Sequence, residues 1–141
     1  KQKTAYEIST RDWSSDVCSS DLGLPARRVF IGECGLSWEA CGGDGKVHEQ
    51  RNREILAKFL SWRPALVLYW QLYNNEVKDG KQAGFWLIDD KKRPTPLYGT
   101  LHDLLAQQEE VAKEMLQRSR RLPSFEEMGA FSENWLNQRG R

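Results

Sequence analysis

The chain has 141 residues, enough for one domain, and 21 Lys or Arg against 20 Asp or Glu give it a formal net charge of +1. This balance argues against a nucleic-acid or anionic-membrane surface, because both depend on clustered basic residues. Three cysteines are too few, and odd in number, for a disulfide scaffold. No apolar run reaches the roughly 20 residues of a membrane helix. The composition therefore indicates a soluble globular domain that binds neither nucleic acid nor membrane.

The first 22 residues do not resemble native protein sequence. Residues 1–8 and 12–22 back-translate into DNA that resembles the two constant arms of a common short-read sequencing adapter, and residues 9–11 stand where its index lies. We therefore exclude residues 1–22 from the fold prediction as an adapter-derived artefact. On this interpretation the native sequence resumes at Gly23, and the chain is expected to be the C-terminal piece of a longer protein.

The next predicted elements are a strand, a loop and a helix. Arg28–Glu33 is a short apolar run with β-branched and aromatic residues, which is typical of a buried strand. Residues 34–46 hold four glycines and are predicted to form a loop. Val47–Trp62 is rich in helix formers and stops before Pro64, so a helix is predicted there.

A second strand and a second helix follow. Ala65–Trp70, running on to Tyr73, is a continuous apolar run of the kind buried on both faces of a parallel sheet. A shorter apolar stretch, Phe85–Ile88, comes next. Thr95 as the cap and Pro96 at the first helical position then predict the start of a long amphipathic helix.

The order strand, helix, strand, helix predicts an α/β protein with parallel strands. Residues 23–121 are assigned to this domain, and residues 122–141 are interpreted as a polar C-terminal tail. Glu33 and Trp70 then stand at the carboxyl ends of the two strands. In β/α barrels and doubly wound sheets alike, this end of the strands carries the chemistry.

Four short motifs carry a resemblance to a known family: Ile31–Gly35, Tyr69–Asn74, Gly84–Asp89 and Thr95–Tyr98. In this order they resemble the seventh strand, the eighth strand and the closing segment of clan-A retaining glycoside hydrolases of the cellulase-like, family-five type. The resemblance covers about residues 28–105 and implies a C-terminal fragment of a (β/α)₈ TIM barrel, namely strands seven and eight with their helices. Cys34 departs from the family, which commonly has an aromatic residue there.

The same resemblance implies roles for individual residues. Retaining glycosidases use one carboxylate as nucleophile and a second carboxylic acid about 5–5.5 Å away, and Glu33 matches the nucleophile. Trp70 matches the tryptophan that forms a wall for the sugar. Tyr73, Asn74 and Trp38 belong to loops on the same face and are expected to contact substrate. The structural alternatives are a surface carboxylate for Glu33, barrel filling for Trp70 and ordinary loop surface for the others.

The acid that would protonate the leaving group is not found in this chain. In the family it is the Glu of an Asn–Glu pair on strand four, ahead of the nucleophile, whereas Asn75–Glu76 follows Glu33. Glu76 is therefore interpreted as a rim residue, and the acid/base is expected in the missing upstream part.

A metal site is not expected. Cys34, Cys41 and His48 repeat every seven residues, whereas a structural zinc site usually needs four ligands in tighter pairs. The thiols are predicted to be unpaired, with a Cys34–Cys41 disulfide as the alternative. His48 is placed in the first turn of its helix, and His102 on the solvated side of the last helix; neither shows a partner for a catalytic triad.

The resemblance implies an enzyme that hydrolyses a β-linked poly- or oligosaccharide with retention of configuration and without a cofactor. The chain alone is expected to be inactive, and the full-length protein is expected to be secreted or periplasmic. Two alternatives remain open: a barrel that binds carbohydrate without catalysis, and a small stand-alone α/β domain of another role.

Overall fold

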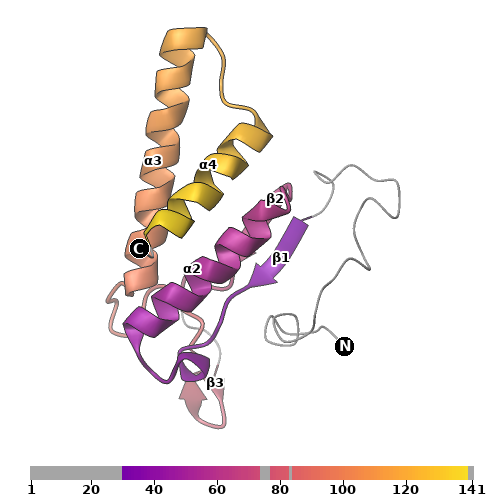
Figure 1. The fold of residues 1–141 in the computed structure, drawn as a ribbon. Helices are drawn as coiled ribbons and strands as arrows, with labels where there is room; N and C mark the ends of the chain where they lie inside the picture. Colours follow the sequence, from indigo (N-terminus) through magenta and orange to yellow (C-terminus); the bar gives the residue numbers. More distant parts are fainter. Residues whose placement is uncertain (1–29, 74–76, 83, 140–141) are drawn as a thin grey trace, which may run out of the picture.

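The computed structural model describes residues 30–73, 77–82 and 84–139 (Figure 1). Its elements in chain order are β1 (Phe30–Cys34), the 3-10 helix η2 (Glu39–Cys41), α2 (Gly45–Ser61), β2 (Leu66–Tyr69), β3 (Val77–Lys78), β4 (Lys81–Gln82), α3 (Pro96–Ser119) and α4 (Phe125–Gln138). The predicted mixed α/β class is confirmed. The adapter-like residues 1–22 lie outside the described residues. Within the described ranges, none of the helices combines the length and apolar character that a membrane crossing demands.

Strands β1 and β2 form a two-stranded parallel sheet connected through α2, as the sequence pattern predicts. Phe30 pairs with Leu66, and Ile31 pairs with Val67. The hairpin β3–β4 is antiparallel and separate from this sheet. The described chain therefore contains one βαβ unit followed by a hairpin and two helices.

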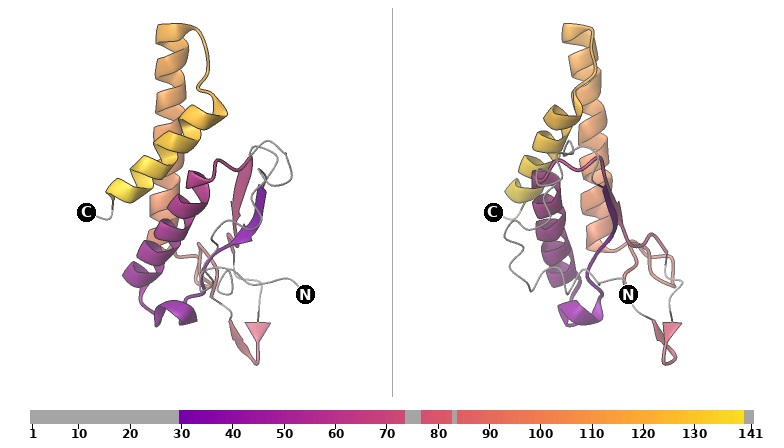
Figure 2. Two further views of the ribbon diagram at one scale, coloured as in Figure 1. Left: turned by 45° about the vertical axis from the view of Figure 1, so that its right-hand side comes forward. Right: turned by 90° about the vertical axis from the view of Figure 1, so that its right-hand side faces the viewer.

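The second strand is shorter and less buried than the sequence predicts. Strand β2 ends at Tyr69, because the residues after it pair with another segment: Gln71 N–H donates to Phe85 O (3.1 Å), and Leu87 N–H donates to Gln71 O (2.9 Å). Leu66 and Leu68 are about half exposed, so the expectation of burial on both faces is wrong for this chain. The reason is that helices cover only one side of the sheet (Figure 2). Of the strand predicted at 28–33, residues 28 and 29 lie outside the described residues, and Phe30 in the described part is exposed too.

Helix α2 begins two residues before the predicted Val47 start. Asp44 is its N-cap, and the Asp44 carboxylate accepts hydrogen bonds from Lys46 N–H (2.7 Å) and Val47 N–H (3.0 Å). Gly45 fits in the first turn because a Cβ there would lie 3.0 Å from the Trp38 ring. A helix therefore starts inside the glycine-rich segment that composition assigns to a loop. The predicted cap of α3 is confirmed, since Thr95 Oγ1 accepts from Tyr98 N–H.

Residues 125–138, within the segment interpreted as a polar tail, form helix α4. Ser124 and Glu127 make a capping box in which each side chain bonds the backbone N–H of the other residue. Hydrogen bonds from Arg121 and from the Ser124 backbone lower the pKa of Glu127 to about 2. The sequence Ser-x-x-Glu was the available signal for this helix.

The core lies between the covered face of the sheet and the three helices. Its buried residues come from β1, α2, α3 and α4: Cys34, Leu56, Ala57, Phe59, Leu104 and Leu136. Ile31, Val67 and Tyr69 pack on it from the strands. Helix α2 lies at the centre of this packing and contacts both α3 and α4 (Figures 1 and 2). The helices thus cover one face of the sheet, and the candidate site lies at the carboxyl ends of the strands.

Candidate functional site

Glu33 lies near the carboxyl end of β1, in an irregular part of the strand. Between the pairs Ile31–Val67 and Cys34–Tyr69, β1 has one residue more than β2. Ile31 and Cys34 both pack toward the helices, whereas Glu33 between them is exposed. Bulges are rare in parallel pairs, and an extra residue of this kind can redirect a side chain. The bulge therefore presents the Glu33 carboxylate to solvent at the end of a buried layer.

The structure brings Trp70 to the neighbouring strand end. Trp70 N–H donates to Cys34 O (2.8 Å), which ties the residue after β2 to the residue after Glu33. Gly35 permits this close approach, since its φ is +152° and a Cβ there would lie 2.9 Å from Trp70 O. The Trp70 side chain is half-buried, and the Trp70–Gln71 peptide bond is cis. Glu33 and Trp70 thus lie at the same end of the sheet, the carboxyl end of its two strands, as their positions in the sequence predict.

The other three predicted substrate contacts differ in their placement. Tyr73 is 59% exposed and forms a parallel bridge with Ile88. Asn74 lies outside the described residues, as does the Asn75–Glu76 pair. Trp38 is half-buried, and its ring contacts both His48 (centroids 5.3 Å apart) and Trp86 (6.4 Å apart, planes within 14°). Trp38 is therefore partly a packing residue, and Trp86 was not singled out by the sequence reasoning.

Two buried polar residues of α2 hold the loop that follows Glu33. His48 is completely buried, with Nε2 3.0 Å from Leu36 O, so Nε2 carries the proton that it donates. Asn52 Oδ1 accepts from Leu36 N–H (2.6 Å), and Asn52 Nδ2 donates to His48 O (2.8 Å). The spacing of four residues on a helix places both side chains on one face. His48 and Asn52 therefore clamp the backbone beyond the bulge, a role that sequence reasoning missed.

The burial of His48 makes stability depend on pH. Burial lowers the pKa of His48 below its ordinary value of 6.5, against opposing effects of the Leu36 carbonyl and Glu49. Near pH 6.5 His48 therefore binds a proton in the unfolded chain but stays neutral in the folded chain. As a result, the free energy of unfolding falls as the pH drops through this range. Urea unfolding between about pH 5.5 and 7.5 measures the slope. We expect His48→Gln to flatten it.

His102 provides the matched control for this prediction, because its side chain is 67% exposed on α3. His102→Gln is expected to change the slope less than His48→Gln does. An equal slope in the wild-type chain and in His48→Gln would show that His48 does not contribute to it.

Both described cysteines are free and buried. The Cys34 thiol donates to Leu68 O (3.3 Å), and burial raises the pKa of Cys34 to about 12. A thiol with this pKa is protonated at neutral pH and is a poor nucleophile or metal ligand. Among the described residues, no three side chains of His, Cys, Asp or Glu are grouped to hold a metal ion.

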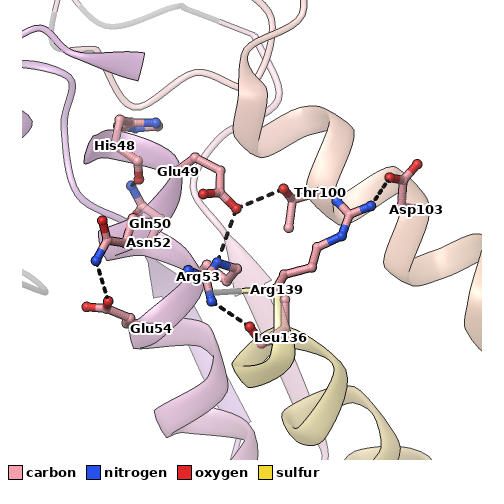
Figure 3. A network of polar contacts seen from close by, with 10 residues as sticks. All are labelled: His48, Glu49, Gln50, Asn52, Arg53, Glu54, Thr100, Asp103, Leu136 and Arg139. Carbon is pink, nitrogen blue, oxygen red and sulfur yellow. Dashed lines mark hydrogen bonds and ion pairs between the residues drawn. The ribbon is translucent and has the colours of Figure 1, made fainter. Parts of the chain in front are cut away.

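A second polar network, away from Glu33, fastens the three helices to one another (Figure 3). Arg53 is 5% exposed; its Nε lies 3.2 Å from Glu49 Oε1, and its Nη1 donates to Leu136 O at the end of α4 (2.6 Å). Thr100 Oγ1 of α3 donates to the same Glu49 oxygen (2.9 Å). Arg139 pairs with Asp103 beside this network. The network therefore fixes α2, which in turn holds the loop after Glu33.

No profile of a known protein family, no curated protein sequence and no solved structure matches this chain.

Proposed function

We propose that this chain is the C-terminal part of a retaining (β/α)₈-barrel glycoside hydrolase that acts on a β-linked poly- or oligosaccharide. One observation carries the proposal: a carboxylate, Glu33, is exposed at a bulge near the carboxyl end of a parallel strand, and Trp70 at the end of the next strand bonds through its N–H to the carbonyl of the adjacent Cys34. A nucleophile and a flat apolar ring at neighbouring strand ends are what attack on a sugar ring in a barrel requires.

The uncovered face of the sheet supports the barrel part of the proposal. Phe30, Leu66 and Leu68 are exposed on strands that are parallel, and parallel sheets are normally buried on both faces. An apolar hollow of about 700 Å³ also opens beside β2, between α3 and α4, and is lined by residues such as Leu105 and Phe125. In a longer protein, further strands would cover the exposed face of the sheet, and another segment beside β2 would fill the hollow on the helix side.

In the proposed mechanism the Glu33 carboxylate attacks the anomeric carbon, and the bond to the leaving oxygen breaks. A second carboxylic acid, supplied by sequence beyond this chain, gives its proton to that oxygen and later takes a proton from water as the water releases the sugar from Glu33. Trp70 offers its indole face to the pyranose ring. His48 and Asn52 act indirectly, by fixing the loop next to the nucleophile.

The test is an activity assay of the longer protein, obtained by extending the reading frame upstream of Gly23. Incubated with a panel of β-glucans, β-mannans and xylans, it is expected to release sugars whose anomeric configuration, followed by proton NMR, is initially retained. The 141-residue chain by itself is expected to release no sugar. Initial inversion, or turnover by the printed chain alone, would contradict the proposal. Sugar binding without turnover would favour the non-catalytic barrel.

A further inference from the structure

A second hollow lies near the carboxyl ends of the strands, between the loop after β1 and the segment that leads into α3. It has a volume of about 540 Å³ and is lined by Trp38, Trp86, Asp90, Lys91, Pro94 and Pro96, among others. We call it the Trp38–Trp86 hollow. Its size is within the range of ordinary small-ligand sites, about 300–1,000 Å³.

The two tryptophans of the hollow are held in place by the fold. Trp38 N–H donates to Gly84 O (2.6 Å). Gly84 has a φ of +79°, and a Cβ there would lie 2.7 Å from Trp38 Cβ, so only glycine allows this contact. The Trp38 ring contacts buried His48, and the Trp86 ring stacks on Trp38 with nearly parallel planes. Trp86 is half-buried and lines the hollow, so part of its ring is open to a ligand there.

The charges of the hollow balance. Asp89 accepts hydrogen bonds from Arg93 Nε (2.8 Å) and from Lys91 N–H (2.9 Å), so its charge is paired. One further acid, Asp90, and one further base, Lys91, lie on the rim with exposed side chains. A site of this kind has no net attraction for an anion or a cation. Apolar rings with a few polar groups of both signs suit a neutral, polyhydroxylated ligand.

We propose that the Trp38–Trp86 hollow binds one ring of a neutral β-linked oligosaccharide. Trp86 stacks on the apolar face of the ring, and Asp90 accepts hydrogen bonds from its hydroxyl groups. The inference rests on the proposed function for its ligand class, and it adds a sugar contact separate from the Glu33–Trp70 edge. The segment 84–88, whose backbone bonds both Trp38 and Gln71, connects the two places.

The test is an NMR titration in which cellotetraose is added to the 141-residue chain, whose tryptophans are labelled with ¹⁵N. The indole N–H signal of Trp86 is expected to shift on addition of the sugar. Trp86→Ala and Asp90→Ala are each expected to raise the dissociation constant by about tenfold, a loss of roughly 1.4 kcal/mol. Trp62→Ala is the matched control, because Trp62 is exposed beyond the end of α2 and is not part of the hollow.

The outcomes separate this inference from the proposed function. If Trp70→Ala weakens binding and Trp86→Ala and Asp90→Ala do not, the hollow is not a sugar site and the Glu33–Trp70 proposal stands. If cellotetraose, mannotetraose and xylotetraose all fail to bind while the longer protein hydrolyses its substrate, the inference alone is wrong. Asp90 is exposed, so Asp90→Ala tests the hollow even where Trp86→Ala disturbs the packing.

Discussion

Replacing Glu33 with Ala in the longer protein is expected to lower the turnover of a β-linked substrate by roughly 10⁴-fold, because the substitution removes the carboxylate that we propose forms the covalent intermediate. Added azide is expected to restore part of the turnover. It fits the space left by the carboxylate, attacks the anomeric carbon from the same side and releases a glycosyl azide of inverted configuration. Reaction rates with and without azide, and proton NMR of the product, measure both effects.

Glu39 is the control for this experiment. It is an exposed carboxylate only six residues further along, in η2. Glu39→Ala is expected to keep normal turnover and to show no response to azide. If Glu33→Ala retained turnover, or lost it without any azide product, Glu33 would not be the nucleophile. The alternative of a barrel that binds sugar without catalysis predicts no turnover in any variant and unchanged binding by Glu33→Gln.

Arg53→Ala is expected to lower the free energy of unfolding of the chain by about 3–5 kcal/mol. The substitution leaves the Glu49 carboxylate and the Leu136 carbonyl without their cationic partner in a buried place between α2 and α4. The desolvation of these oxygens is then no longer offset. Urea denaturation followed by circular dichroism measures the loss.

Two further substitutions sharpen this prediction. Arg51 lies two residues away on the exposed face of α2, with a single hydrogen bond to Ala40 O, so Arg51→Ala is expected to cost less than about 1 kcal/mol. Arg53→Lys keeps the charge but cannot make both contacts, so an intermediate loss is expected. Equal stabilities of Arg51→Ala and Arg53→Ala would mean that the network of Figure 3 does not fasten the helices.

The elements with a strong local signal were predictable from sequence. Thr95 and Pro96 mark the start of α3 by side-chain capping and by the fixed φ of proline, and both effects depend only on neighbouring residues. The parallel arrangement of β1 and β2 follows from the helix between them. The position of Glu33 and Trp70 at one edge follows in turn, because parallel strands end on the same side.

What sequence reasoning missed depends on contacts between distant segments. Trp86 belongs to the hollow only because Gly84 lets its segment pack against Trp38, 46 positions earlier. The bulge that exposes Glu33 arises because β1 has one residue more than β2 in the paired stretch, and no single residue of β1 predicts it. Helix α4 is different, since the Ser-x-x-Glu pattern of its capping box is visible in the sequence. The mostly polar composition of the segment argued against a packed helix, although the helix carries apolar residues as far as buried Leu136.

The central claim is that Glu33 forms a covalent bond with the sugar, and trapping that intermediate tests it most directly. A 2-deoxy-2-fluoro-β-glycosyl fluoride carries a good leaving group, whereas its C2 fluorine slows release of the sugar from the enzyme. After incubation with the longer protein, proteolysis and mass spectrometry locate the label. We predict the fluorosugar on Glu33; a label on another carboxylate of a protein that hydrolyses the parent substrate would contradict the account.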